Sequence, residues 1–320
     1  MMQLPNRWRW LRPLAAVLFV GFAVAVVASQ WEEARQAAAT THVTWSLIAA
    51  ATATVLGAYA LLIETWRRTV AAWGGSERLG WSDAARIWFI SNLGRYVPGK
   101  VWQIGAMGMM AQERGVSPVA AAGSAVIVNI VSVIAGVGVV VATGGRVLAR
   151  YAGETAALAA VLIIALLILP VGATLMLRLY RRLTGRELNI GALPPRALVV
   201  ALVGTSVAWL LYGVAFRWFA LGVGTSSTAG LASYTAAYTF SYLLGYLVLF
   251  APGGIGVREG ALVASMTQLG LASSGEATLV AVTSRLWLTA LEVAPGVLLL
   301  TLGAARQSPR SPSSPNQSSE

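Results

Sequence analysis

The chain has 320 residues, of which 57% are hydrophobic and only 11% are charged, and its formal net charge is +11. Soluble globular proteins have about a quarter of their residues charged, so this composition indicates an integral membrane protein. The absence of cysteine excludes disulfides, thiolate metal sites and cysteine nucleophiles, and the single histidine, His42, leaves almost no material for histidine catalysis or metal binding. The basic residues fall in short clusters between apolar runs, a pattern typical of membrane topology and of anionic lipid contact, not of nucleic-acid binding.

Several apolar segments are candidates to cross a bilayer, which requires about 20 residues. In chain order they are 14–29, 45–63, 118–143, 156–177, 197–221, 229–250 and 277–303. The first follows a group of arginines, and Ala28-Ser29 is a poor cleavage site, so we interpret it as a retained signal anchor. The fold class predicted is therefore all-α and polytopic, with about 7–8 transmembrane helices in one membrane domain, 1–306. The tail 307–320 is rich in Ser and Pro and is expected to be disordered.

The distribution of basic residues predicts the orientation. The N-terminus contains three, the loop at 64–86 four and the loop at 178–196 five, whereas the loop at 30–44 contains one and the loop at 222–228 none. Basic loops stay on the cytoplasmic side, which places the N-terminus and both basic loops there. This alternation requires 87–110 to enter and leave on the same face, as a re-entrant or broken hairpin.

The segment 253–270 contains Arg258 and Glu259 and is interpreted either as a second half-helix or as a short span. Arg306 and Arg310 favour a cytoplasmic C-terminus, which would require this segment to cross. The sequence leaves both interpretations open.

The stretch 91–100, SNLGRYVPGK, interrupts an apolar region with the helix-breaking residues Gly94, Pro98 and Gly99. Within a bilayer, the backbone groups freed by such a break must be buried in protein or must line a wet cavity. Arg95 and Lys100, the only lysine of the chain, stand beside the break. A phosphate suits such cations, because arginine binds it bidentately and lysine acts as a point charge. The alternative is a cytoplasmic loop with snorkelling cations.

A second stretch, FAPGGIGVREG at 250–260, repeats this pattern with Pro252, Gly253 and Gly254 followed by Arg258. Paired Gly/Pro interruptions in two halves of a transporter indicate a binding site formed by discontinuous helices. Arg258 and Glu259 are adjacent and point to different sides of a helix, so each needs its own partner.

The last predicted span contains Arg285 and Glu292, which lie on one helix face about two turns apart. Ionisable groups inside a membrane indicate a functional site, and the alternative is an ion pair that orients packed helices. Tyr238 and Tyr242 belong to a tyrosine stripe of four-residue spacing in 229–250, which would line a hydrophilic path or serve helix packing. The predicted substrate-binding residues are Arg95, Lys100, Tyr238, Tyr242, Arg258, Glu259, Arg285 and Glu292.

No nucleotide-binding, nucleophile-elbow or metal-ligand motif occurs, so the sequence predicts no catalytic residues, no metal and no cofactor. The motifs SNLGRYVPGKVWQ at 91–103, ERGVSP at 113–118, APGGIGVREGAL at 251–262 and SRLW at 284–287 resemble the lysylphosphatidylglycerol synthase transmembrane region, a flippase-like family also called UPF0104. The resemblance covers roughly 45–303 and includes WRRTVAAWG at 66–74.

This resemblance implies a multi-pass protein of the bacterial cytoplasmic membrane that moves or modifies lipids. It implies membrane lipids as partners, either aminoacylated or linked to an isoprenoid phosphate, and a glycosyltransferase or lipid-synthesis enzyme as an associated protein. A common version of the first motif has a Gly-Glu pair with a downstream arginine, whereas this chain has Pro98-Gly99-Lys100, a difference that argues against an aminoacyl-lipid cargo. The chain ends at 320 without a soluble aminoacyl transferase domain, so we do not expect enzyme activity.

The leading hypothesis from the sequence is an ATP-independent lipid flippase, or a translocation factor for lipid-linked glycans, that binds an anionic phosphate headgroup. A second hypothesis is a non-transporting membrane partner that scaffolds a glycosyltransferase or a lipid-modifying enzyme. A third is an intramembrane lipid transferase with Glu259 or Glu292 as base.

Overall fold

The computed structural model describes residues 43–74, 79–96, 101–144, 193–225, 227–247 and 256–305, together with the isolated residues 175, 178, 182 and 254. Helices and their connections make up this part of the chain, without strands, which confirms the all-α prediction there. Several predicted features lie outside the described residues. They are the span 14–29, the span 156–177 apart from residue 175, the break residues Pro98, Gly99, Pro252 and Gly253, the side chains of Arg95 and Lys100, and the tail 307–320.

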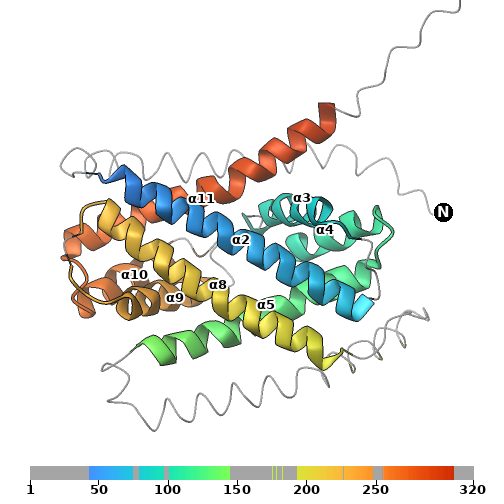
Figure 1. The fold of residues 1–320 in the computed structure, drawn as a ribbon, viewed down its shortest axis with the longest axis horizontal. Helices are drawn as coiled ribbons and strands as arrows, with labels where there is room; N and C mark the ends of the chain where they lie inside the picture. Colours follow the sequence, from blue (N-terminus) through green and yellow to red (C-terminus); the bar gives the residue numbers. More distant parts are fainter. Residues whose placement is uncertain are drawn as a thin grey trace, which may run out of the picture.

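The described part contains eight α-helices and one 3-10 helix (Figure 1). In chain order they are α2 (Trp45–Gly74), α3 (Trp81–Asn92), η2 (Leu93–Tyr96), α4 (Val101–Gln112), α5 (Pro118–Thr143), α8 (Pro195–Gly222), α9 (Leu231–Leu247), α10 (Val257–Gln268) and α11 (Ser274–Ala305). Within these residues, four helices are long and apolar enough to cross a membrane, namely α2, α5, α8 and α11. This number is lower than the 7–8 spans that the sequence predicts.

Helix α5 illustrates how the local sequence sets the helix boundaries. Ser117 is its N-cap, with the Oγ accepting a hydrogen bond from the backbone N–H of Ala120 at 3.4 Å. Pro118 occupies the first turn, where its missing N–H costs nothing, and Gly144 follows the last residue. The helix between them is apolar almost throughout, which suits burial on one side against protein and on the other against lipid.

Helices α2 and α8 pack against each other along their length, because small residues line the contact. The start of α2 lies beside the end of α8, where the N–H of Thr44 donates to the carbonyl of Gly222 at 2.8 Å, so the two helices are antiparallel. In the middle, Gly204 lies directly against Thr65, and a Cβ at Gly204 would be only 2.0 Å from the Thr65 hydroxyl oxygen. Small residues permit this close backbone approach where lipid supplies no hydrophobic driving force.

The first predicted break lies in a helical hairpin formed by α3 and α4. Each helix has 12 residues, which at 1.5 Å per residue is about 18 Å and too short to cross a hydrocarbon core of about 30 Å. Asp83 and Arg114 form an ion pair at the open end of the hairpin. At the tip, Gln103 donates a hydrogen bond to Asn92 Oδ1, and the Cα of Gly94 lies against the backbone of Gln103.

The second break lies in another hairpin, formed by α9 and α10. The helices have 17 and 12 residues, and they contact each other from the open end to the tip. At the open end Ser227 Oγ donates to the carbonyl of Gly270 at 3.3 Å, and near the tip Gly245 lies against Arg258. The segments that the sequence suggests as a span, 229–250, and as a half-helix or short span, 253–270, are therefore the two arms of one hairpin.

The two hairpins approach the centre of the molecule from opposite ends. The α3–α4 hairpin follows the end of α2, whereas the α9–α10 hairpin follows the end of α8, and these two ends are at opposite sides because α2 and α8 are antiparallel (Figure 1). The same order of elements, a long helix, a short hairpin and a second long helix, thus occurs in α2 to α5 and again, reversed in direction, in α8 to α11. Inverted repeats of this kind are typical of transporters with a central site between discontinuous helices.

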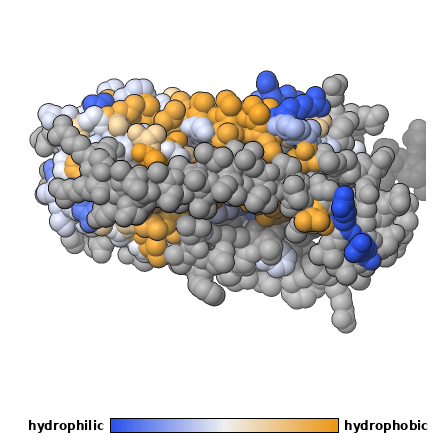
Figure 2. All heavy atoms as spheres, turned by 90° about the horizontal axis from the view of Figure 1, so that it is seen from below, coloured by the Kyte–Doolittle hydropathy of each residue, from blue (hydrophilic) through white to orange (hydrophobic). Residues whose placement is uncertain are grey.

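The surface agrees with a membrane location. On the face shown in Figure 2, hydrophobic residues gather over the middle of the molecule and hydrophilic residues lie towards the two ends of its long axis. Helix α8 contributes an exposed apolar stripe of Val199, Val203, Val207 and Leu210. Large aliphatic side chains in a helical stripe, exposed between polar ends, are suited to contact with lipid chains.

We expect the Gly204→Ala variant to be less stable than the wild-type protein. A Cβ at this position would also lie 3.0 Å from the Cβ of Thr65, so the helices α2 and α8 must separate, and overpacking of this kind costs about 1–3 kcal/mol. Thermal unfolding in detergent measures the effect. The matched control is Gly57→Ala on α2, where a Cβ has no neighbour within 4 Å, and it should leave the unfolding temperature unchanged or raise it. Equal effects of both variants would contradict the close α2–α8 contact.

The opposite directions of the two hairpins predict opposite labelling of two single-cysteine variants. The chain has no cysteine, so Gln112→Cys at the end of α4 and Gln268→Cys at the end of α10, both exposed positions, give unambiguous signals. With the basic ends of the helices in the cytoplasm, a membrane-impermeant maleimide should label Gln268→Cys in intact cells and should label Gln112→Cys only after permeabilisation. Labelling of both from the same side would rule out this arrangement.

Candidate functional site

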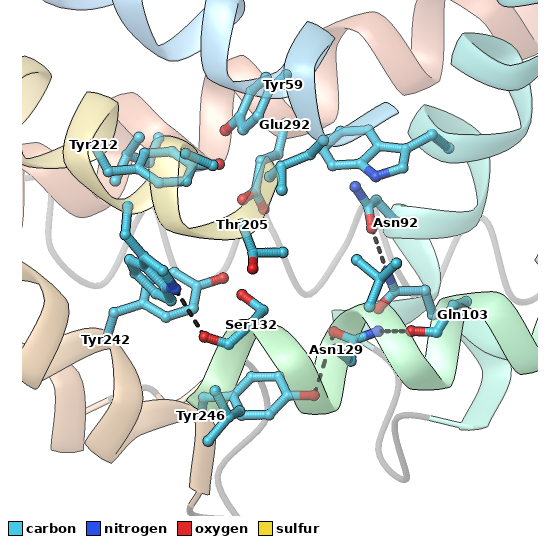
Figure 3. A pocket seen from close by; sticks show the side chains of 18 of the residues that line it. Tyr59, Asn92, Gln103, Asn129, Ser132, Thr205, Tyr212, Tyr242, Tyr246 and Glu292 are labelled. Atoms are coloured by element: carbon cyan, nitrogen blue, oxygen red, sulfur yellow. Dashed lines mark hydrogen bonds between the residues drawn. The ribbon is translucent and has the colours of Figure 1, made fainter. Parts of the chain in front are cut away.

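A cavity of about 190 Å³ lies between the helices, and all eight described α-helices contribute to its lining. Figure 3 shows its polar side chains, which point into the cavity from helices far apart in the sequence. One water molecule takes about 30 Å³ in the liquid, so the cavity is large enough for several waters or for a small polar group. A cavity of this size, with mostly apolar walls and several polar and charged side chains, is the main candidate for a binding site.

The tips of both hairpins border this cavity. Asn92 ends α3 and Gln103 lies in the first turn of α4, while Tyr246 lies near the end of α9 and Arg258 near the start of α10, and all four line the cavity. The sequence predicts two breaks of similar pattern without showing that they meet. The structure brings the residues that flank both breaks to one place, although most of the break residues themselves lie outside the described residues.

Arg258 is the most distinctive cation of the site. It is 7% exposed, and its Cζ lies 4.8 Å from the ring centroid of Tyr242 and 5.3 Å from that of Tyr238, which are cation–π distances. Among the described residues, its Nη2 has no hydrogen-bond partner. Gly245 makes the position possible, because a Cβ there would lie 2.8 Å from the Cβ of Arg258. A buried guanidinium with an unused donor is suited to bind an anion.

Glu259, the next residue, turns to a different set of partners, as its position in a helix predicts. Its Oε2 accepts a hydrogen bond of 2.6 Å from the N–H of Gly256, which precedes α10 with a positive φ of 82°. Its Oε1 lies 3.6 Å from Nε of Arg285 on α11, a residue that is buried. The carboxylate therefore stabilises the start of α10 and links it to α11, the long helix that follows.

Arg285 and Glu292 both line the cavity from α11, as expected from their seven-residue spacing. With Arg258 and Glu259, the described part of the site contains two cations and two anions, so it is formally neutral. Removing one partner from such a buried cluster leaves an uncompensated charge, which costs several kcal/mol, about 3–5 in soluble proteins. The ion-pair interpretation and the functional interpretation of these residues are thus compatible, because the pair holds Arg285 at the cavity wall.

The tyrosine stripe of α9 divides into two parts. Tyr234 and Tyr238 are buried and pack on Phe216, with ring centroids 6.2 and 5.2 Å apart, which is the packing role. Tyr242 and Tyr246 line the cavity, and the hydroxyl of Tyr246 donates to Asn129 Oδ1 at 3.4 Å. Tyr238 contributes indirectly, because its ring lies against Arg258.

Three amide side chains of the cavity were not among the predicted site residues. They are Asn92, Gln103 and Asn129. Asn129 carries a signal in the sequence, because it is the only amide or charged residue in the apolar stretch 118–143. Asn92 and Gln103 lie inside the motif 91–103. They are uncharged and do not break helices, so the prediction did not include them.

The comparison with known families identifies the family of the chain. A family model described as the lysylphosphatidylglycerol synthase TM region matches residues 10–296, a range that includes both hairpins and every charged residue of the cavity. No curated protein matches the chain. The match confirms the resemblance seen in the motifs and indicates a function related to membrane lipids. The chain therefore belongs to the lysylphosphatidylglycerol synthase transmembrane region family.

Proposed function

We propose that the protein is an ATP-independent translocation factor for a membrane lipid, and that its cavity binds the phosphate of the headgroup. The observation that supports this most strongly is the buried Arg258, whose Nη2 lacks a partner among the described residues in a cavity bordered by two helix breaks. Ionisable groups at membrane depth are costly and are kept where they serve a path or a site. We propose the bacterial cytoplasmic membrane as its location, with the N-terminus in the cytoplasm, and no covalent chemistry on the lipid.

Arg258 is the proposed primary phosphate ligand. Its guanidinium lies against the rings of Tyr238 and Tyr242, and its Nη2 has no hydrogen-bond partner among the described residues. A phosphate in the cavity would receive these donors as charge-assisted hydrogen bonds, which are about twice as strong as neutral ones. The tyrosine rings therefore act as a support that keeps the cation in place while Nη2 remains available to the phosphate.

Arg285 is the proposed second cation, and Glu259 controls its availability. In the present arrangement Arg285 Nε lies 3.6 Å from Glu259 Oε1. The other carboxylate oxygen of Glu259 is bound to the N–H of Gly256, so the carboxylate can keep the start of α10 capped while Arg285 turns to a phosphate. Exchange of one anionic partner for another avoids leaving either arginine uncompensated in a medium of low dielectric.

The two hairpins give the proposed path two possible openings, one towards each side of the membrane. They reach the cavity from opposite ends of the antiparallel pair α2 and α8, so separation of either hairpin from its neighbours would open the cavity to one side of the membrane. Transporters with inverted repeats and broken helices alternate access to a central site in this way. The lipid chains would remain in the bilayer while the headgroup passes between the tips.

We expect Arg258→Gln to reduce the transbilayer movement of an anionic lipid about tenfold or more, because hydrogen bonds to charged groups contribute about 1.5–3 kcal/mol. The measurement is dithionite quenching of fluorescent phosphatidylglycerol in liposomes that contain the purified protein. Arg258→Lys should recover only part of the activity, since lysine keeps the charge but lacks the planar fork. Arg114→Gln is the matched control, because this arginine is exposed and paired with Asp83 outside the cavity.

Lipid movement that is equally fast with the wild-type protein and with Arg258→Gln would contradict the proposed site. The variant proteins must elute as folded particles in size-exclusion chromatography, and Arg285→Gln provides a second test on another helix. Liposomes in which the wild-type protein moves no lipid, combined with co-purification of a glycosyltransferase or a lipid-synthesis enzyme from the native membrane, would favour the scaffold hypothesis instead.

A further inference from the structure

The polar lining of the cavity has two chemically different sides. Arg258 lies on one side, against the ring of Tyr242, and contributes a positive charge. The amides of Asn92, Gln103 and Asn129 lie across the cavity from Tyr242 in Figure 3. This second side is contributed by α3, α4 and α5, and the three amides are neutral. A phosphate accounts for the first side but not for the second.

The amide side is suited to hydroxyl groups. An amide has two N–H donors and an oxygen with two acceptor positions, and a hydroxyl group both donates and accepts. The hydrogen bonds of Asn129 use part of this capacity, because its Nδ2 donates to the carbonyl of Ala125 at 2.8 Å and its Oδ1 accepts from Tyr246. The remaining N–H and the second acceptor position of Asn129 are available in principle to a ligand. Ser132 and Thr205 extend the neutral polar lining between the two sides.

Aromatic rings complete the lining. Trp209 is held by a hydrogen bond from its Nε1 to the carbonyl of Ser132 at 2.8 Å, and its ring lies edge-on to Tyr242 with the centroids 5.3 Å apart. Trp88 lies at the cavity wall near Asn92. Fixed aromatic faces interspersed with neutral hydrogen-bonding groups recognise ligands that alternate C–H and O–H surfaces.

We propose that the cavity takes a headgroup in which a phosphate carries a neutral polyhydroxyl group, such as a sugar, inositol or glycerol, with the phosphate at Arg258 and the hydroxyl groups at Asn92, Gln103 and Asn129. This inference rests on the proposed function, because it assigns the headgroup class of the same cavity. Glu292, which lies between the two sides in Figure 3, accepts hydroxyl hydrogen bonds in this arrangement.

Calorimetric titration of the purified protein with short-chain lipids that differ only in headgroup tests the inference. The probes are dihexanoyl phosphatidylinositol, dihexanoyl phosphatidic acid and dihexanoyl phosphatidylethanolamine. We expect the inositol lipid to bind about tenfold tighter than the other two, the effect of one or two net hydrogen bonds. Asn129→Leu, which keeps the volume and removes the amide, should bring the inositol lipid to the affinity of phosphatidic acid and leave phosphatidic acid unchanged.

The control variant is Gln112→Leu, which removes an exposed amide at the end of α4 and should change none of the three affinities. Equal binding of phosphatidic acid and the inositol lipid would overturn the inference and assign the amides to helix packing alone. Tightest binding of phosphatidylethanolamine would overturn it in favour of an ammonium group at Glu292. If Asn129→Leu lowered the affinity for all three lipids equally and also lowered the unfolding temperature, the inference would be overturned as well.

The outcomes distinguish this inference from the proposed function. A preference for the inositol lipid that depends on Asn129, in a protein that moves no lipid in liposomes, would support the ligand class and refute translocation. Lipid movement that depends on Arg258 but not on the headgroup would support translocation and refute the ligand class.

Discussion

Helix ends within a membrane leave backbone groups that no water satisfies, and the described structure is organised around this constraint. The chain places two such interruptions in short hairpins, and residues that flank both interruptions line one cavity together with the long helices. Gly256 gives the best-defined example, because its N–H is satisfied by the Glu259 carboxylate at 2.6 Å. A side chain beside a break thus satisfies a backbone group that the interruption leaves without a helical partner.

The close packing around the cavity depends on glycine at a few positions. Gly254, with a φ of 72°, leaves no space for a Cβ, which would lie 2.6 Å from the carbonyl oxygen of Gly245. Gly245 in turn lies against Arg258, and Gly296 of α11 lies against Phe89 and Leu93 at the tip of the first hairpin. Larger residues at these three positions would push the ends of the hairpin helices away from their neighbours.

The charges of the cavity are balanced by contacts between helices. Arg285 and Glu259 join α11 to α10, while Arg258 rests on tyrosines of α9. Each of these three charged side chains therefore contacts another helix. An arrangement of this kind combines stability with the capacity to exchange partners, since a bound anion replaces one contact with an equivalent one. The hydroxyl and amide groups on the other side of the cavity add hydrogen-bonding capacity without adding charge.

The sequence by itself determined the membrane class, the all-α fold, the family and the two interruptions, because hydropathy, helix breakers and motifs are local properties of the chain. It also predicted Arg258, Arg285 and Glu292 as site residues, and all three line the cavity. Only the tertiary structure decided that 229–250 and 253–270 form one hairpin, that Glu259 is the partner of Arg285, and that Asn92, Gln103 and Asn129 share a cavity with them. These facts depend on contacts between residues that are far apart in the sequence. Neither periodicity nor composition shows which helix faces meet.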